Sequence, residues 1–282
     1  MRLAIPSKGR LHEPTTNLLE RAGLQIRDGS DRKLYAKTVD DEITVLYARA
    51  SDIPEYVHDG AADLGITGLD QVREAEVELE TLLDLEYGNC RLVVASPEDD
   101  EINSVEQLEG KKIATEFPNI TRRYFAEKGV NVNIVRVSGS TELTPNVGMS
   151  DAIVDITSTG TTLEVNHLKV VDEVLKSSCH LFTRPELMGD PKVNEIKNAL
   201  KSVIDAEGKR YLMMNASEKD LKGIKEVMPG LGGPTVMRVE GNDDLVAVHA
   251  VVDESDIYET INKVKEKGAR DILVVPIERM MR

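Results

Sequence analysis

Residues 152–163 read Ala-Ile-Val-Asp-Ile-Thr-Ser-Thr-Gly-Thr-Thr-Leu. An apolar strand ends at Asp155, a turn rich in hydroxyls and glycine follows, and a helix can begin at Thr162. In open α/β sheets, ligands bind at the carboxyl ends of strands, and a helix start offers unpaired N–H groups to an anion. This stretch therefore predicts an α/β fold with a phosphate-binding loop.

The side chains of this loop suit a sugar phosphate. Gly160 allows the backbone to approach a ligand closely. Four hydroxyls can donate hydrogen bonds without adding charge, those of Ser158, Thr159, Thr161 and Thr162. Asp155 is badly placed for a phosphate but can accept from sugar hydroxyls, so a ribose phosphate is the expected ligand. Taken alone, the pattern also fits an ordinary strand–turn–helix with capping hydroxyls.

Short apolar runs alternate with helical patterns outward from this loop, which is typical of α/β units. The first set of expected strands is Arg2–Pro6, a hairpin of Lys33–Val39 with Glu42–Ala48, and Leu64–Thr67, with helices at Pro14–Ala22 and Asp52–Asp59. The second set is Cys90–Ser96, Lys112–Glu116, Asn133–Val137 and Ala152–Ile156, with helices near Val105–Leu108, Ile120–Lys128 and Leu143–Val147. Leu168–Val174 and Cys179–Thr183 then return the chain, and Lys192–Glu207 is expected to be a helix.

The residues after Gly208 form a compact pattern of their own. They are expected to give strand Tyr211–Asn215, helix Glu218–Val227, strands Thr235–Val239 and Leu245–Val252, helix Asp256–Lys267 and strand Ile272–Pro276. The order βαββαβ is that of the ferredoxin-like split unit. A separate C-terminal domain is therefore expected.

Composition narrows the class of protein. The 282 residues carry a net charge of −15, which argues against nucleic acid or an anionic membrane as the main partner. No apolar stretch approaches the roughly 20 residues of a membrane span, and the start lacks a signal-peptide pattern. Cys90 and Cys179 lie in apolar runs and are expected to be buried, reduced thiols, as in a cytoplasmic protein. The five histidines show no pairing that would suggest a metal site.

Residues upstream of the phosphate loop extend it into a longer pattern, whose spacing is specific enough to compare with known families. The combined pattern is Glu142-x5-Gly148-x-Ser150-x2-Ile153-x-Asp155-Ile156-x2-Thr159-Gly160-x-Thr162-Leu163. It resembles the motif of ATP phosphoribosyltransferase, the first enzyme of histidine biosynthesis. The likeness covers essentially the whole chain, including the opening Ala4–Leu11 and the segment Cys90–Ala95 that matches the crossover between the family's two lobes.

The resemblance implies the long form of this family and its domains. The fold would be a two-lobed, type II periplasmic-binding-protein-like α/β core followed by a ferredoxin-like domain of the ACT type. Residues 1–89 and 179–207 would form the first catalytic lobe and residues 90–178 the second, with the phosphate loop. Residues 208–282 would form the regulatory domain.

Cations and acids near strand ends are candidate substrate ligands. Lys8 and Arg10 flank a glycine after the first strand, so both could converge on pyrophosphate oxygens, and Arg49 could meet the same anions. Residues 65–68 are expected to turn close to a nucleotide, from which Asp70 could accept a hydrogen bond. Each position also fits a solvated turn or a helix cap.

The resemblance implies a reaction in which ATP condenses with 5-phosphoribosyl 1-pyrophosphate and pyrophosphate is released. Mg²⁺ usually bridges substrate phosphates with one or two protein carboxylates. Glu142 and Asp155 are the candidates for that role or for gripping ribose hydroxyls. Histidine would inhibit the enzyme by binding to the C-terminal domain near Leu231, Thr235 and Ala269. The resemblance also implies a homo-oligomer that exists as a dimer and as a hexamer.

Three other functions remain open at this point. A phosphoribosyltransferase could act on another base, because the motif concerns only the ribosyl donor. A two-lobed protein of this kind could bind a solute without catalysis. A pure amino-acid sensor would use only residues 209–282 and would leave the phosphate loop unexplained.

Overall fold

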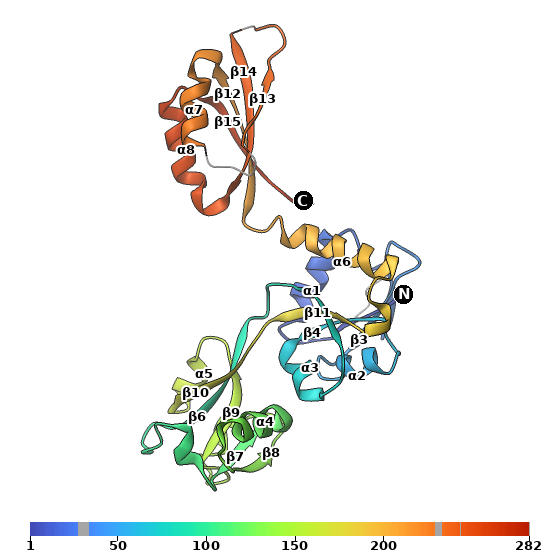
Figure 1. The fold of residues 1–282 in the computed structure, drawn as a ribbon, viewed down its shortest axis with the longest axis vertical. Coiled ribbons are helices and arrows are strands. Elements are labelled where there is room, and N and C mark those ends of the chain that lie inside the picture. The colour runs from blue at the N-terminus through green and yellow to red at the C-terminus, as the bar shows by residue number, and fades with distance from the viewer. Residues whose placement is uncertain (28–33, 229–232, 243, 282) are drawn as a thin grey trace. The chain divides into compact units, whose positions relative to one another are not determined.

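The computed structural model describes the chain apart from residues 28–33, 229–232, 243 and 282. The chain divides into two compact units, Met1–Leu200 and Lys201–Arg282. The first unit contains two sheets and the second contains one (Figure 1).

The first lobe is the part of the Met1–Leu200 unit built on a six-stranded sheet. The strand order is β2-β3-β1-β4-β11-β5. The bounds are β1 Arg2–Pro6, β2 Tyr35–Lys37, β3 Thr44–Ala48, β4 Leu64–Gly68, β5 Glu80–Asp84 and β11 Cys179–Thr183. Its helices are α1 His12–Arg21, α2 Ile53–His58, α3 Leu69–Ala75 and α6 Pro191–Ile204, with a 3₁₀ turn η3 at Pro185–Leu187. Because β3, β1 and β4 are parallel, their carboxyl ends meet at one edge of the sheet.

The second lobe is the part built on a five-stranded sheet in the order β10-β6-β9-β7-β8. The bounds are β6 Cys90–Pro97, β7 Lys112–Thr115, β8 Asn133–Arg136, β9 Ala152–Thr157 and β10 Leu168–Ser177. Its helices are α4 Pro118–Lys128 and α5 Thr161–Val165, with 3₁₀ turns η1 Val105–Leu108 and η2 Thr141–Leu143. Strands β9, β7 and β8 are parallel, so their carboxyl ends also share an edge.

The two lobes are joined by two crossings of the chain. One runs from β5 of the first sheet to β6 of the second, and the other returns from β10 to β11. The second sheet is buried on both faces: Leu92, Val94 and Val154 pack with α4, whereas Val93, Ala95 and Ile153 pack with Leu163 of α5. The strands of the second sheet therefore end at the surface of a core that is packed on both faces.

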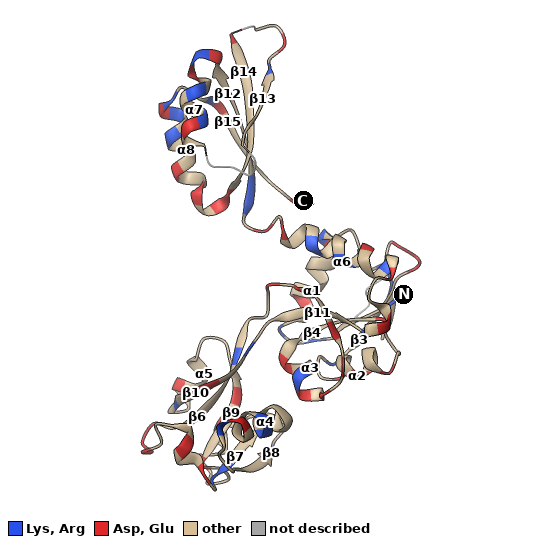
Figure 2. Ribbon diagram, viewed as in Figure 1, with Lys and Arg blue, Asp and Glu red and all other residues tan. Residues whose placement is uncertain are grey.

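The Lys201–Arg282 unit has the expected βαββαβ order. Its bounds are β12 Lys209–Ser217, η4 Glu218–Asp220, α7 Leu221–Val227, β13 Thr235–Arg238, β14 Leu245–Asp253, η5 Glu254–Asp256, α8 Ile257–Glu266 and β15 Arg270–Pro276. The antiparallel sheet runs β13-β14-β12-β15, with α7 and α8 on one face. Figure 2 shows both signs of charge on the two helices and mostly uncharged residues on β13 and β14. The fold class expected from the sequence is confirmed.

Several local expectations need correction. Residues 143–147 do not form an α-helix, because η2 ends at Leu143 and the following residues turn. Residues 65–68 do not turn either; they belong to β4, which is buried throughout. A Cβ on Gly65 would lie 2.7 Å from side-chain carbons of Ile53 and Val57, so this glycine allows α2 to pack on β4. Helix α3 and strand β5 were not predicted.

In the described part of the chain, no helix combines the length and apolar character needed to cross a membrane. Cys90 and Cys179 are buried free thiols, as expected. Burial raises the pKa of Cys179 to about 12.

Candidate active site

The loop after β9 has the geometry of an anion-binding turn. Gly160 adopts a φ of +88° at the start of α5, and an added Cβ would meet no atom within 4 Å. Its N–H donates to the Thr157 hydroxyl at 2.9 Å, and the Glu164 N–H donates to the Gly160 carbonyl at 3.1 Å. The N–H groups of a helix's first turn have no partner within that helix. The Thr161 N–H donates to the Thr159 hydroxyl at 3.4 Å, and the N–H groups of Thr162 and Leu163 are placed to donate to a ligand.

The expected hydroxyl donors surround this turn. Ser158, Thr159, Thr161 and Thr162 are all exposed. The hydroxyls of Thr159 and Thr161 lie 3.0 Å apart, so one donates to the other. Together they present neutral donors beside a helix start, which suits a phosphate in a chain of negative net charge.

A cation from the first lobe reaches this loop. The Arg10 guanidinium Nη1 donates to the Ser158 hydroxyl at 3.0 Å, across 148 residues of sequence. Arg10 follows β1 and Arg49 follows β3, two parallel strands that end side by side, with Pro6 opposite Ala48. Lys8 and Arg49 are exposed at the same strand ends. Among the described residues, Arg10 is the one of these three cations with a recorded contact to the loop.

Asp155 lies on β9 in an acidic environment. Burial raises its pKa to about 6, and Glu142 and Glu116 add to this rise, while the Ile156 N–H, 2.7 Å from Oδ1, and the Thr141 hydroxyl oppose it. The structure thus brings the sequence-predicted Asp155 and Glu142 into one electrostatic neighbourhood.

Glu116 is a third carboxylate that sequence reasoning missed. Strand β7 pairs with β9 in parallel, with Thr115 opposite Val154, so Glu116, just past the end of β7, lies beside Asp155 of β9. The sequence did contain a signal for Glu116, because this residue ends the expected strand Lys112–Glu116, which belongs to the same set as Ala152–Ile156. Carboxyl ends of neighbouring parallel strands share one edge.

The other motif residues shape the loop that carries Glu142. Thr144 donates to the Thr141 carbonyl at 2.8 Å and shares a 2.8 Å hydrogen bond with the buried Ser150 hydroxyl. Gly148 provides a φ of +72° between them. Ser150 and Gly148 therefore fix the turn, which leaves Glu142 half-buried.

Asp70 is buried, with 4% of its surface exposed. Its carboxylate accepts from the Ser177 hydroxyl at 2.6 Å and from the Gln71 side-chain amide, and its own N–H donates to Ser177 at 3.0 Å. Ser177 ends β10, where the chain crosses back to the first lobe. These contacts tie the start of α3 to the crossover strand and occupy the carboxylate.

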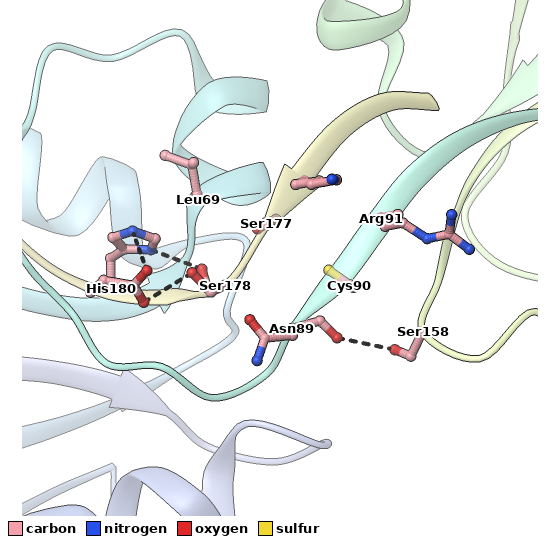
Figure 3. A pocket seen from close by; sticks show the side chains of 10 residues that line it. Leu69, Asn89, Cys90, Arg91, Ser158, Ser177, Ser178 and His180 are labelled. Carbon is pink, nitrogen blue, oxygen red and sulfur yellow. Dashed lines mark hydrogen bonds and ion pairs between the residues drawn. The ribbon is translucent and has the colours of Figure 1, made fainter. Parts of the chain in front are cut away.

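A cavity of about 460 Å³ lies between these elements (Figure 3). Residues of both lobes line it: Leu69, Asp84, Asn89, Cys90, Arg91, Ser158, Lys176, Ser177, Ser178 and His180. Ser158 therefore belongs both to the phosphate loop and to the wall of this cavity. A ligand held at the loop could extend into it.

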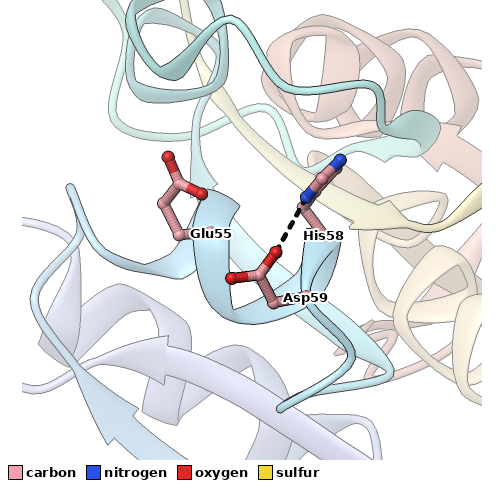
Figure 4. A group of neighbouring side chains, drawn as sticks. All are labelled: Glu55, His58 and Asp59. Atoms are coloured by element: carbon pink, nitrogen blue, oxygen red, sulfur yellow. Dashed lines mark hydrogen bonds and ion pairs between the residues drawn. The ribbon is translucent and has the colours of Figure 1, made fainter.

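Among the described residues, one group of three possible metal ligands has its ligand atoms within 4.8 Å of one another. It consists of Glu55 and His58 on α2 and Asp59 just after it (Figure 4). All three are exposed, and His58 Nδ1 lies 3.0 Å from Asp59 Oδ1. Exposed groups of this kind are common without an ion, so they indicate no metal centre.

The expected effector residues lie on different elements of the Lys201–Arg282 unit. Thr235 is exposed at the start of β13, opposite His249 of β14. Ala269 is buried just before β15, and its N–H donates to the Val264 carbonyl at 3.0 Å. Leu231 lies outside the described residues.

The fold and this loop together are typical of a two-lobed α/β transferase with an anion-binding turn in its second lobe. The family described as ATP phosphoribosyltransferase matches residues 49–202, and the family described as its C-terminal domain matches residues 206–279. Two relatives named ATP phosphoribosyltransferase match the full length of this chain and of themselves, at 63% identity in Natronomonas pharaonis and 60% in Haloarcula marismortui.

A solved structure is also similar. An ATP phosphoribosyl transferase (HisG:HisZ) complex from Thermotoga maritima aligns with a TM-score of 0.65 and 34% identity, covering 73% of this chain and 98% of that one. The chain belongs to the ATP phosphoribosyltransferase family, in its long form, and is an enzyme of the glycosyltransferase type. The family overturns the alternatives of a non-catalytic solute-binding protein and a pure sensor.

Proposed function

We propose that this enzyme transfers the 5-phosphoribosyl group of phosphoribosyl pyrophosphate to N1 of ATP and releases pyrophosphate, the committed step of histidine biosynthesis. The observation that carries the proposal is the hydrogen bond from Arg10 to Ser158. It joins a cation from one lobe to the hydroxyl loop of the other, which is the arrangement that a phosphate and a pyrophosphate on one ribose require.

Each part of the donor has a matching group. The N–H groups and hydroxyls of residues 158–162 would bind the 5-phosphate. Asp155 and Glu142 would accept from ribose hydroxyls. Arg10, with Lys8 and Arg49 at the same strand ends, would bind the pyrophosphate oxygens and stabilise the charge that develops on the leaving group.

The acceptor needs no general base, because adenine N1 carries a neutral lone pair. The chain's task is to hold N1 in line with the anomeric carbon, and such orientation can lower a barrier by roughly 7–11 kcal/mol at best. The acceptor would lie in the cavity beside Ser158, next to the donor. Asp70 would support it indirectly, since its carboxylate fixes the start of α3 against Ser177.

The carboxylates suit Mg²⁺. Asp155, Glu142 and Glu116 offer hard oxygen ligands at one edge of the second lobe, and Mg²⁺ prefers such ligands together with substrate phosphates. When bound, the ion would supply positive charge to the phosphate oxygens. Asp155 and Glu142 are our proposed protein ligands.

Regulation by histidine belongs to the same proposal. The match of residues 206–279 to the family's C-terminal domain supports an effector site there, with Leu231, Thr235 and Ala269 as proposed contacts. We propose that residues 1–89 with 179–207 and residues 90–178 form the two catalytic lobes, and that residues 208–282 form the regulatory domain. A homo-oligomer is proposed as well, and light scattering coupled to size exclusion would test it.

The experiment for catalysis is an incubation with ATP, phosphoribosyl pyrophosphate and Mg²⁺. The expected result is the ultraviolet change of an N1-substituted adenine, together with one pyrophosphate per product. Replacement of ATP by nucleotides of other bases tests the remaining alternative. Equal transfer to another base and none to ATP would refute the proposed acceptor.

A further inference from the structure

The start of helix α4 has no capping side chain of its own. Phe117 holds the N-cap position and makes no side-chain cap, and Pro118 follows as the first helical residue. An aromatic side chain cannot accept from the N–H groups of the second and third helical positions, which a capping serine or aspartate would serve. Those two groups are the N–H groups of Asn119 and Ile120.

Both N–H groups are satisfied from the other lobe. Glu74, on α3 of the first lobe, accepts from the Asn119 N–H at 3.1 Å with each carboxylate oxygen and from the Ile120 N–H at 3.0 Å. The carboxylate also lies at the positive end of the α4 dipole. Burial raises the pKa of Glu74 above its ordinary 4.5, against the lowering effect of those same N–H groups.

The contact is reciprocal. The Asn119 side-chain amide donates to the Glu74 carbonyl at 2.8 Å, so a second-lobe residue caps the last turn of α3. Arg123 of α4 adds a 2.9 Å ion pair to Glu76, the residue that ends α3 with a φ of +56°. Helix α3 therefore supplies the acceptor for the N–H groups at the start of α4, and α4 supplies a donor for a carbonyl at the end of α3.

The position of this contact links it to the active site. Helix α3 begins at the carboxyl end of β4, and α4 follows the carboxyl end of β7, so both leave the edges that face the substrate loops. The start of α3 is also tied to the crossover strand through Asp70 and Ser177. Separation of the lobes would expose the start of α4 and would also remove Arg10 from Ser158.

We infer that Glu74 is a positioning residue: by capping α4 across the lobe boundary it favours the lobe arrangement in which Arg10 reaches the phosphate loop, here called the closed arrangement. The part concerning Arg10 and the donor rests on the proposed function, whereas the part concerning lobe closure does not. Loss of a helix cap corresponds to a shift of roughly two- to thirty-fold in an equilibrium constant.

The test measures lobe separation and kinetics in the same variants. Spin labels on Glu20→Cys of the first lobe and Asp99→Cys of the second, both exposed, report the interlobe distance in the full chain without substrates. Glu74→Ala should shift the distribution to longer distances, and Asn119→Ala should shift it less. Glu74→Gln, which keeps one acceptor and the side-chain volume, should restore most of the wild-type distribution and remains usable if the alanine variant does not fold. Glu127→Ala, an exposed glutamate on α4, is the matched control.

Kinetics separate positioning from general damage. Glu74→Ala should raise the KM for phosphoribosyl pyrophosphate by roughly two- to thirty-fold with kcat little changed, because saturating donor restores closure. An unchanged distance distribution in both Glu74 variants would overturn the inference. A fall in kcat with an unchanged KM would also overturn it. If the distances shift but even the wild type transfers no phosphoribosyl group, the role of Glu74 in closure stands and the proposed function fails.

Discussion

The Arg10 guanidinium donates to the Ser158 hydroxyl at 3.0 Å, and the same hydroxyl lies 3.4 Å from the Asn89 carbonyl. Ser158 therefore stands between the loop after β1 and the crossover into β6. Since Arg10 carries a permanent charge, the contact places positive charge at the phosphate loop before any substrate binds.

Gly160→Val should raise the KM for the phosphoribosyl donor by roughly 10–100-fold, as the loss of one or two charge-assisted hydrogen bonds would. The valine needs a φ other than +88°, and its branches would project into the open space where the phosphate is expected. Gly129→Val is the matched control, because Gly129 has a φ of +71° and equally open surroundings at the end of α4. Similar KM values in the two variants would contradict the phosphate assignment.

Asp155→Asn should stabilise the protein at pH 8 and slow turnover. The folded-state pKa of Asp155, about 6, lies above the ordinary 3.8, so the folded state holds the proton more tightly. The protonated Asp155 carboxyl therefore contributes its full stabilisation of the folded state below about pH 4, and this contribution is lost as the pH rises through about 6. Removal of this charge, which burial and, to a smaller extent, Glu142 and Glu116 disfavour, should raise the free energy of unfolding by roughly 1–3 kcal/mol at pH 8 and by little at pH 4.

Denaturant melts at the two pH values measure this difference, with the exposed Asp99→Asn as control. Equal stabilisation at both would show that charge is not the cause. The pH–rate profile should lose no limb, since Asp155 is not expected to act as a base. The loss of one limb would assign it that role.

Neither cysteine should react with a thiol reagent in the folded protein over minutes at pH 8. Cys90 and Cys179 are 6% and 1% exposed, and the pKa of Cys179 near 12 leaves almost no thiolate. Both should react at once in denaturant, and the exposed Glu20→Cys variant should react in the folded state. Rapid modification of the wild type would mean that the strands at the crossover open readily.

Truncation after Glu207 should abolish inhibition by histidine while some phosphoribosyl transfer remains. The effector is proposed to bind the C-terminal unit, and a preference of 1–3 kcal/mol for one state corresponds to roughly 5–150-fold coupling. Thr235→Ala provides a full-length test at an exposed position. If the truncated enzyme stays inhibited, the effector binds the catalytic lobes, and if the intact enzyme never responds, the regulatory proposal is wrong.

Sequence patterns predicted the elements with strong apolar runs or clear turns. Strands β1, β4 and β9 appear within one or two residues of their expected bounds, as does the C-terminal βαββαβ order. Strand β5 was not predicted because it is a short edge strand whose residues are exposed or only partly buried. An edge strand has one pairing partner and needs little apolar surface, so its pattern is weak.

The errors have local causes. Residues 143–147 lie between η2 and Gly148, whose φ of +72° ends the run, so the segment is too short for more than turns. Gly65 and Gly68 were interpreted as turn residues, yet they serve close packing: a Cβ on Gly68 would meet the Asp70 carboxylate at 2.2 Å.

The sequence predicted the residues of the phosphate loop and, through the end of the first strand, Arg10 as a site residue, but not which residues touch one another. Residues 155–162 form a continuous motif, and Glu142 belongs to it by spacing. The contacts of Arg10 with Ser158 and of Glu74 with Asn119 join residues 148 and 45 positions apart, so they depend on how the lobes pack. No local pattern encodes such a distance.

Whether Arg10 and Ser158 bind the phosphoribosyl donor together is tested by a double-mutant cycle on the rate of N1-phosphoribosyl-ATP formation. The four proteins are the wild type, Arg10→Gln, Ser158→Ala and the double variant. We expect the wild type to form this product. Each single change should lower kcat/KM for the donor by roughly 10-fold or more, with the double variant little worse than Arg10→Gln, because the two groups act on one ligand through one contact. Independent, multiplying losses in the double variant, or no product from the wild type, would contradict the account.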